Sequence, residues 1–433
     1  MKRRREGFSV QDSLAELGQL VRTAGADVVG QSIQKMDRVN PATFIGRGKL
    51  NEIVALRPEL AFDLLVFDEE LHPNQQREIE DAFGPQDIKV LDRTALILDI
   101  FAQHARTKEG ALQVELAQYE YRLPRLTRMW THLARQAGGA AARGGTGGVG
   151  LRGPGERQLE LDRREIRTRI AHLKREIEDV RTHRREYRRK RRKEGIAVVA
   201  IVGYTNAGKS TLLNTLCGSD VLAENKLFAT LDPTTRRVKL PSGSEVLFTD
   251  TVGFIQKLPT ELVAAFRATL EEIAEADVLL HVLDITHPNM REQERAVQET
   301  LEQIGAGGKP MVVALNKADK SLAIAESIKS PWVVREGGPE NDSGAVRISA
   351  LTGAGIGDLL KRVEEVLGEN LVDMAVRVPF AANDLVALFH QRGIVEREEY
   401  TEKGTLIQGK IAARLVPQFA GYELARRQTN SPG

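Results

Sequence analysis

The chain has 433 residues, is 41% apolar and carries a net charge of +2. Its length favours about three domains, each with enough apolar residues for a hydrophobic core. The single cysteine, Cys217, excludes an intrachain disulfide and fits a reducing compartment. The first residues lack the apolar run of a signal peptide, and no stretch approaches the roughly 18 apolar residues of a membrane-spanning helix. We therefore expect a soluble, cytoplasmic protein.

The small net charge conceals a strongly basic segment. Residues 155–193 contain sixteen Lys or Arg against eight Asp or Glu, so the rest of the chain is acidic. A block of one sign either contacts a polyanion or forms a well-solvated face.

Residues 1–104 alternate between helical and strand-like segments, which predicts a small α/β domain. We expect helices at 14–24 and 74–84, and strands at 27–36, 62–68 and 88–92. The segment TFIGRGKLNEI at 43–53 could present the amides of Gly46 and Gly48 to an anion at a helix start. A plain glycine turn before a helix is the simpler interpretation, and we favour it.

Residues 105–195 predict an antiparallel helical hairpin. Apolar residues recur at helical spacing in two stretches and would cover each other in such a pair. They are Leu112, Leu116, Tyr119 and Leu123 in the first stretch, and Ile166, Ile170, Leu173, Ile177 and Val180 in the second. The glycine-rich connector 138–155 is longer than a helix pair needs and carries Arg143 and Arg152. It is either a functional tip that orders on a partner, which we favour, or a passive loop.

Residues 196–368 read as a doubly wound, mainly parallel α/β sheet. Buried-type strands are expected at 196–202, 245–250, 278–284, 311–315 and 345–349, with helical segments between them. The remaining residues, 369–433, predict a small α+β domain. Its expected strands at 374–380 and 404–416 flank a helix at 384–393, in which His390 is better taken as a helix-end residue than as a ligand.

Four motifs occur in order within 196–368: GYTNAGKS at 203–210, FATLD at 228–232, DTVGF at 250–254 and NKAD at 316–319. The first fits the phosphate-binding pattern G-x-x-x-x-G-K-[ST]. Each motif is weak by itself, and together they indicate a guanine-nucleotide pocket. The residues that we expect to contact GTP are Gly203, Tyr204, Thr205, Asn206, Ala207, Gly208, Lys209, Ser210, Phe228, Ala229, Thr230, Leu231, Asp232, Asp250, Thr251, Val252, Gly253, Asn316, Lys317, Ala318, Asp319, Ser349, Ala350 and Leu351.

The phosphates and Mg²⁺ define one end of this pocket. Glycines at 203 and 208 let the loop amides face the phosphates, and Lys209 would reach the β- and γ-phosphate oxygens. Ser210 would ligate Mg²⁺ directly, while Asp250 would hold it through water. Gly253 would bring its amide close to the γ-phosphate.

The guanine ring defines the other end. Asp319 can accept hydrogen bonds from the N1–H and the exocyclic amine of guanine, which adenine does not offer in that arrangement. Asn316 and Lys317 would brace the loop, and the amides of Ser349, Ala350 and Leu351 could contact the base edge. Leaving a buried carboxylate unpaired costs about 1–3 kcal/mol, so Asp319 can discriminate strongly.

Three further segments resemble the HflX family of translation-factor-class GTPases, relatives of Obg. They are RTKEGALQVELAQYEYRLPRL at 106–126, GLRGPGERQLELDRR at 150–164 and FATLDPTTR at 228–236, and the similarity covers roughly 20–370. The resemblance implies a GTPase that binds the large ribosomal subunit and ribosomal RNA and acts in ribosome rescue, splitting or recycling. It implies that Thr230 is the Mg²⁺ ligand of the first switch, with Thr234 and Thr235 close enough to compete. It also implies that 138–155 faces the peptidyl-transferase region.

The candidate catalytic residues are Lys209, Thr230 and Gly253. Phe254 stands where Ras-like enzymes have a water-orienting glutamine, so we expect slow intrinsic hydrolysis that a partner stimulates. The alternative for Phe254 is a core-filling role, which still leaves the glutamine absent. Asn206 is also found in similar GTPases that use K⁺ near the phosphates, which makes K⁺ a candidate cofactor beside Mg²⁺.

Two rival functions stay open. The chain could be an RNA-remodelling NTPase with an additional ATP site in residues 1–104, which ATP binding by a fragment lacking 196–368 would reveal. It could also be a non-ribosomal switch with peripheral membrane association through its basic segment, although the apolar stripe at 166–180 is better used inside a helix pair. We expect the protein to be a monomer.

Overall fold

A computed structural model gives the fold of most of the chain. It describes residues 8–84, 88–138, 154–193, 196–218, 227–228, 230–257, 267–320, 345–369 and 371–424. Within these ranges, no helix is both long enough and apolar enough to cross a membrane.

The N-terminal region is a small α/β unit. Its elements are α1 (Val10–Thr23), α2 (Arg47–Leu60), β1 (Leu64–Phe67), α3 (Pro73–Ala82), β2 (Lys89–Asp92) and α4 (Arg93–His104). A capping box between Ser9 and Asp12 starts α1, and Pro73 occupies the first position of α3, where its missing N–H costs nothing. Strands β1 and β2 pair in parallel, and Leu50, Phe67 and Ile79 are among the residues that form a local core beside them.

The strand predicted at 27–36 is wrong, because this stretch has no regular secondary structure. Val29 and Ile33 are about half exposed, so the apolar residues of the stretch do not line a buried face as a strand's would. The segment instead packs along the domain by side chains. The Gln34 Oε1 atom accepts a hydrogen bond of 2.8 Å from the Gly46 amide at the start of α2. That amide is therefore already bonded within the chain, which supports the glycine-turn interpretation of TFIGRGK over an anion site.

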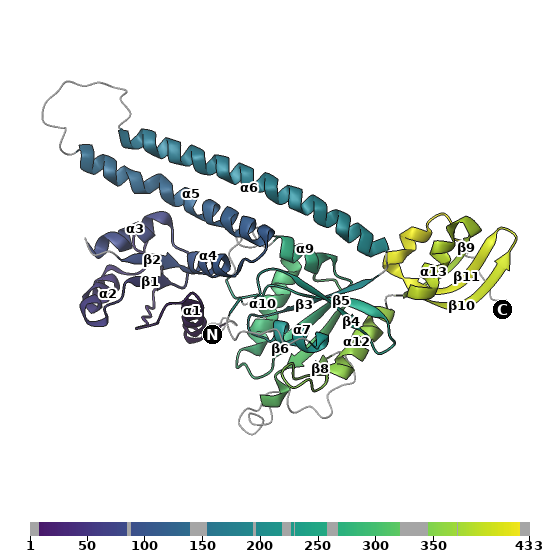
Figure 1. Cartoon of the computed structure of the whole chain (residues 1–433). Helices are drawn as coiled ribbons and strands as arrows, with labels where there is room; N and C mark the ends of the chain where they lie inside the picture. Colours follow the sequence, from purple (N-terminus) through teal and green to yellow (C-terminus); the bar gives the residue numbers. More distant parts are fainter. Residues whose placement is uncertain are drawn as a thin grey trace.

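Two long helices, α5 (Lys108–Gly138) and α6 (Pro154–Lys193), run side by side along the molecule, with α5 in contact with α3 and α4 of the N-terminal region (Figure 1). Leu112 and Leu173 are buried between apolar faces, and ion pairs of 2.8 Å join Arg169 to Glu115 and Lys174 to Glu120 across the pair. Helix α5 ends at Gly138 and α6 begins at Pro154, so the helices include the first and last residues of the glycine-rich connector 138–155. Its glycine-rich centre, with Arg143 and Arg152, lies outside the described residues.

The sheet of the nucleotide-binding region has the strand order β4-β5-β3-β6-β7-β8. Its strands are β3 (Ala197–Gly203), β4 (Thr234–Lys239), β5 (Glu245–Asp250), β6 (Val278–Asp284), β7 (Met311–Asn316) and β8 (Ala345–Arg347). Its helices are α7 (Lys209–Cys217), α9 (Arg267–Glu275), α10 (Met290–Gln303) and α12 (Ile356–Glu369). Only β4, which the sequence analysis missed, pairs antiparallel among these strands. The predicted fold class is confirmed.

Two buried clusters cover the two faces of this sheet. On one face, Leu212, Leu213 and Val363 from α7 and α12 pack against the strands. On the other face, α9 and α10 are joined by helices from outside the nucleotide-binding region, because Leu20 of α1 and Phe101 of α4 belong to the same cluster. The N-terminal region and the sheet therefore share one continuous core.

The C-terminal region follows with β9 (Leu371–Val378), η1 (Phe380–Ala382), α13 (Asn383–Arg392), β10 (Gly393–Thr401), β11 (Gly404–Ala412) and η2 (Ala413–Phe419). The strands are antiparallel in the order β10-β11-β9. We did not predict β10, whose charged residues hide its alternation. His390 Nε2 lies 2.9 Å from Glu398 Oε2, which ties the last turn of α13 to β10.

Candidate functional site

The phosphate-binding loop connects β3 to α7 at the carboxyl edge of the sheet. Its first glycine, Gly203, has φ +152°, and a Cβ there would lie 2.4 Å from the Val282 carbonyl oxygen. Gly208 has φ +101°, and its Cβ would lie 2.2 Å from Asn316 Nδ2. Both positions therefore require glycine, because a side chain would meet the next strand or the NKAD loop.

Lys209 lies inside this loop and is 6% exposed. Its Nζ donates hydrogen bonds of 3.0 Å to the Gly203 carbonyl and 2.8 Å to the Tyr204 carbonyl. Burial lowers the pKa of Lys209 to about 8, and Asp250 opposes that shift. The ammonium is thus held at the loop by neutral carbonyls, and an anionic phosphate would be a much stronger partner.

Two hydroxyls and one carboxylate meet beside the loop. Ser210 Oγ donates to Asp250 Oδ2 at 2.7 Å, and Thr230 Oγ1 donates to the same oxygen at 2.9 Å. The two hydroxyls are 2.7 Å apart. The structure therefore brings together the three residues that we predicted as metal ligands, from α7, from the 228–232 segment and from β5.

The donor set of this cluster fits a hard divalent cation. Asp250 is 2% exposed, and its Oδ1 atom is buried without a hydrogen-bond partner in the described residues. Burial raises the pKa of Asp250, while Lys209 and the two hydroxyls oppose the rise. A carboxylate oxygen left unpaired beside two hydroxyls suits Mg²⁺, which takes few protein ligands and completes its shell with water and nucleotide phosphates.

Gly253 and Phe254 connect β5 to the phosphate-binding loop. A Cβ on Gly253 would lie 2.8 Å from Thr205 Cα and 3.0 Å from Lys209 Nζ, so only glycine fits. The Phe254 amide donates to the Gly203 carbonyl at 3.1 Å, and its carbonyl accepts from Thr205 at 2.8 Å. The Phe254 side chain is 1% exposed and belongs to the core shared with the N-terminal helices. This side chain fills core space, and position 254 therefore offers no glutamine to orient water.

The NKAD motif follows β7 and braces the phosphate-binding loop from the opposite side. Asn316 donates through Nδ2 to the Ala207 carbonyl at 2.8 Å and accepts from the Ala350 amide at 2.9 Å. Lys317, at φ +66°, donates through Nζ to the Asn206 carbonyl at 3.0 Å and pairs with Asp284 at 2.6 Å. Asp284, at the end of β6, is a site residue that the sequence analysis missed.

The residues predicted to recognise guanine lie together. Ser349 Oγ donates to Asp319 Oδ1 at 2.7 Å, and Ser349 is 1% exposed. Asp319 itself is exposed, as is Leu351, whereas Ala350 is buried. The carboxylate of Asp319 therefore lies at the surface of the pocket. The side chain of Asn206 is exposed too, and its backbone adopts φ +60°.

The remaining predicted residues fall into three groups. Tyr204, Thr205, Ala207, Phe228, Leu231, Thr251 and Val252 are buried, Asp232 and Ala318 are partly exposed, and Ala229 lies outside the described residues. The Thr251 hydroxyl donates to the Ile201 carbonyl at 2.7 Å, which fixes the end of β5 to β3.

Sequence reasoning missed the contribution of the N-terminal region to this site. The Tyr204 hydroxyl donates to Glu16 of α1 and accepts from the Gln256 amide at 2.8 Å. Gln256 Nε2 also donates to Ser13 Oγ at 3.2 Å. The only signal in the sequence is that Ser13 and Glu16 share the helix face of the buried Leu17 and Leu20, where polar residues need partners.

The fold and this arrangement define a P-loop GTPase. Family models match the chain along its length under these descriptions: GTP-binding GTPase N-terminal (11–102), GTP-binding GTPase Middle Region (104–191), 50S ribosome-binding GTPase (198–317) and HflX C-terminal domain (338–433).

Two HflX relatives agree with the models. GTPase HflX of Caldanaerobacter subterraneus subsp. tengcongensis is 44% identical over 412 residues, which is 95% of this chain and 90% of the relative. GTPase HflX of Alkalihalophilus pseudofirmus is 51% identical over 320 residues, covering 74% and 73%. A GDP-bound GTP-binding protein from the archaeon Sulfolobus solfataricus is 26% identical, with coverage of 82% and 95% and a TM-score of 0.40.

The chain belongs to the HflX family of GTPases, and its resemblance to that family is confirmed. It is an enzyme that binds GTP and hydrolyses it to GDP and phosphate. Membership also implies a metal bound with the nucleotide, for which the cluster of Ser210, Thr230 and Asp250 is suited.

Proposed function

We propose that this protein is a ribosome-stimulated GTPase that binds the large ribosomal subunit and acts in ribosome rescue, splitting or recycling. The observation that carries the proposal is a difference along α6: several basic side chains between Arg169 and Arg184 are paired within the protein, whereas Arg163, Arg164 and Arg167, nearer the start of the helix, have no ion pair among the described residues. The description of residues 198–317 as a 50S ribosome-binding GTPase supports it.

Basic residues in the later part of α6 attach the hairpin to the rest of the molecule. Arg181 lies 2.5 Å from Glu271 of α9, and Arg184 lies 2.8 Å from Glu109 of α5. With the pairs from Arg169 and Lys174 described above, these contacts hold α6 against α5 and α9. This part of the helix therefore has a structural role.

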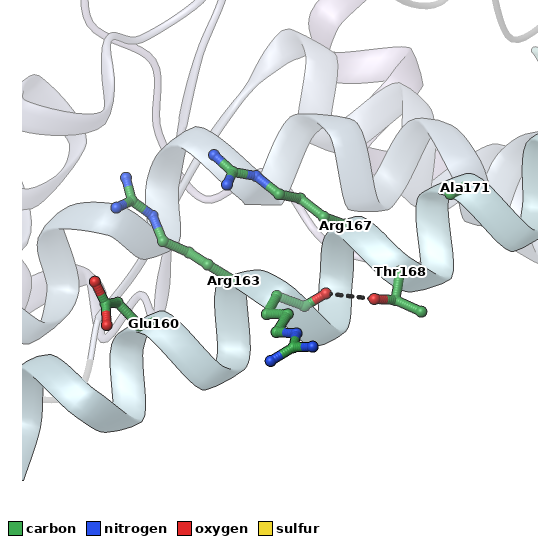
Figure 2. A pocket seen from close by; sticks show the side chains of 6 residues that line it. Glu160, Arg163, Arg167, Thr168 and Ala171 are labelled. Carbon is green, nitrogen blue, oxygen red and sulfur yellow. Dashed lines mark hydrogen bonds between the residues drawn. The ribbon is translucent and has the colours of Figure 1, made fainter.

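Nearer the start of α6, three arginines have no such partners. Arg163, Arg164 and Arg167 line a depression of about 620 Å³ together with Glu160, Thr168 and Ala171 (Figure 2). Their spacing places them on one side of the helix, and Arg164 and Arg167 are exposed. Among the described residues, no ion pair is present for any of the three. Guanidinium groups in such an array match the phosphates of an RNA backbone, which they can bind in bidentate fashion.

In the pocket, we propose that Lys209 binds the β- and γ-phosphates and that Asp319 reads guanine, assisted by Ser349, Ala350 and Leu351. Ser210 and Thr230 would ligate Mg²⁺ directly, and Asp250 would act through water. Mg²⁺ would neutralise phosphate charge during phosphoryl transfer. Thr230 lies at the cluster already, whereas Thr234 and Thr235 belong to β4. K⁺ beside Asn206 stays a prediction, and equal turnover in Na⁺ and K⁺ would contradict it.

Hydrolysis by the isolated protein should be slow. Phe254 cannot orient water, and its ring is enclosed by the core shared with α1 and α4. A missing water-positioning group can cost several orders of magnitude in rate. The ribosome would supply that group or rearrange the segment around Phe254.

The test is GTP turnover with and without purified large subunits. We expect strong stimulation, and expect R163E/R164E/R167E to abolish it while intrinsic turnover is unchanged. A control variant, K361E/K403E/K410E, makes the same change in charge on exposed lysines elsewhere and should keep the stimulation. If large subunits do not raise wild-type turnover, the proposal is wrong.

Salt dependence gives a second measure. Binding through RNA phosphates should weaken linearly in a log–log plot against salt, and losing three phosphate contacts should reduce the slope by about 2–3. Deleting residues 139–153, outside the described ranges, tests whether the glycine-rich tip contributes. Sedimentation of the free protein would test our expectation of a monomer, and fractionation of cells would test cytoplasmic localisation.

A further inference from the structure

The carboxylate of Asp232, two residues after Thr230, is bonded to the start of hairpin helix α5. Its Oδ2 accepts hydrogen bonds of 2.8 Å from the amides of both Arg106 and Thr107. Its Oδ1 accepts from the Thr107 hydroxyl. These contacts join the first switch of the nucleotide pocket to residues more than a hundred positions earlier in the chain.

Thr107 links Asp232 to the helix itself. The Thr107 hydroxyl accepts from the Gly110 amide at 3.0 Å, and its carbonyl accepts from the Ala111 amide at 3.0 Å, which makes it the N-cap of α5. One hydroxyl thus accepts from the helix and donates to the carboxylate. The positive end of the helix also favours a carboxylate at this position.

Gly110 makes the close approach possible. A Cβ at this position would lie 2.3 Å from Asp232 Oδ1 and 3.2 Å from Thr107 Oγ1. Any larger residue in this first turn of α5 would displace the carboxylate. The glycine here serves contact between two segments, since an ordinary helical position would be filled better by alanine.

The residues on either side of Thr230 are held by the same part of the protein. The Phe228 ring meets the Phe101 ring of α4 edge-on, with centroids 4.7 Å apart. Leu231 is 4% exposed in the core that includes Val114 of α5. Thr230 alone in this group points its hydroxyl at Ser210 and Asp250.

We propose that Asp232 is a positioning residue, whose bonds to the start of α5 hold the Thr230 hydroxyl at the metal-binding cluster. Two residues of chain span at most about 7 Å, and Pro233 restricts the conformation of Asp232, so displacing the carboxylate displaces Thr230. The hairpin is thereby connected to the GTPase reaction through the base of α5. Coupling of this kind acts in both directions, so the state of the switch also biases the hairpin. This inference rests on the proposed role of Thr230.

The decisive variant is Gly110→Ala, because it adds one methyl group against Asp232 and changes no charge. Alanine strengthens helices, so loss of function in this variant would not come from a weakened α5. Gly357→Ala is the matched control, since Gly357 lies in the first turn of α12 with open space around its Cβ. Asp232→Asn is a second route to the same defect, because its amide group meets the backbone donors without a full charge.

Both Gly110→Ala and Asp232→Asn should lower kcat for intrinsic GTP hydrolysis by about tenfold, with KM changed less than about twofold. Gly357→Ala should match the wild type. Without nucleotide, hydrogen exchange at the amides of Arg106 and Thr107 should accelerate by about tenfold in Gly110→Ala and Asp232→Asn, because both amides donate to the carboxylate that these variants displace or remove.

Thr230→Ala distinguishes a failure of the proposed role of Thr230 from a failure of the proposed role of Asp232. If Thr230→Ala leaves kcat unchanged, the proposed role of Thr230 fails. If it lowers kcat while Gly110→Ala and Asp232→Asn keep wild-type turnover, Asp232 is not a positioning residue, whether or not exchange at Arg106 and Thr107 accelerates. Unchanged exchange in both variants would also overturn the inference.

Discussion

The N-terminal and C-terminal regions flank the same GTPase sheet, but they are attached to it in different ways. Helices α1 and α4 bury Leu20, Ile97 and Phe101 in a cluster that continues into β3 and the segments 227–231 and 252–255. The C-terminal core, which includes Phe389 and Phe419, is drawn entirely from residues of that region. Figure 1 shows the C-terminal region at the far end of α6, where η2 contacts that helix.

Polar contacts strengthen the difference. Arg93, at the start of α4, is 2% exposed and pairs with Glu16 and Asp68, while it also donates to the Gln256 carbonyl at 3.3 Å. The N-terminal region thus contacts the segment after DTVGF as well as the first switch. The N-terminal region therefore shares a core and buried polar contacts with the GTPase sheet, whereas the C-terminal region has a core of its own.

The largest expected effects come from emptying the two cores. Phe101→Ala and Phe419→Ala each remove a side chain that is 0% exposed, and each should reduce the free energy of unfolding by about 4 kcal/mol. Only Phe101→Ala should also weaken GTP hydrolysis, because its ring supports Phe228 in the first switch. Urea unfolding combined with steady-state GTPase assays makes the comparison. Equal loss of activity in both variants would show that the C-terminal core is not separate.

The division into elements was largely predictable, because apolar spacing and glycines mark the strands, the hairpin and the phosphate-binding loop. The failures have physical reasons. The stretch 27–36 has strand-like composition but pairs with no strand in the part of the chain that the structure describes, while β10 forms despite its charges because β11 pairs along it. Whether a stretch forms a strand depends on the strand beside it, and a local sequence pattern carries no information about that neighbour.

The residues of the candidate pocket could be named from the sequence because they do form local patterns. Its residues come in short contiguous motifs, since each lies on one loop at the edge of a parallel sheet. Asp284 and Glu16 act singly and from distant elements, so no motif signals them. The contacts of Asp232 with α5 were hidden likewise, because they depend on how the hairpin meets the sheet.

Arg93→Ala tests the polar attachment. Removing the guanidinium leaves the carboxylates of Glu16 and Asp68 without their main partner in a largely buried site, which should cost about 3 kcal/mol. Arg77→Ala, which removes a more exposed arginine paired with Asp81 at 3.4 Å in α3, should change stability by less than about 0.5 kcal/mol. Thermal and urea unfolding would measure both. If the two variants were equally stable, the Arg93 network would not attach the N-terminal region.

Acid should weaken the GTPase sheet before the C-terminal region. His281 of β6 is 1% exposed, and burial, helped by Lys209, lowers its pKa to about 4. An unfolded histidine has a pKa of about 6.5, so between these values the unfolded chain binds a proton that the folded chain does not. Stability is therefore present above pH 6.5 and lost as pH falls, by about 2 kcal/mol at pH 5.

Urea unfolding from pH 7 to pH 5 would reveal this loss, and His281→Leu should make the dependence shallower. Hydrogen exchange in β6 and β11 over the same range distinguishes the two regions. Exchange that accelerates equally in both strands would mean that acid acts on the whole molecule, against the comparison.

The smallest expected effects come from removing one exposed basic side chain in each of the two regions. Lys257→Ala removes ion pairs of 2.7 Å to Asp68 and 2.6 Å to Glu69, and Arg397→Ala removes a pair with Glu399 in the C-terminal region. Lys257 is 37% exposed and Arg397 63%, so each change should cost about 0.5 kcal/mol or less. Only Lys257→Ala should alter kcat, by about twofold, because Lys257 fastens the segment after Phe254 to the N-terminal region. Unchanged turnover in both variants would mean that only buried contacts, such as those of Arg93, influence the reaction. An exposed ion pair can hold a segment in place without influencing the reaction beside it.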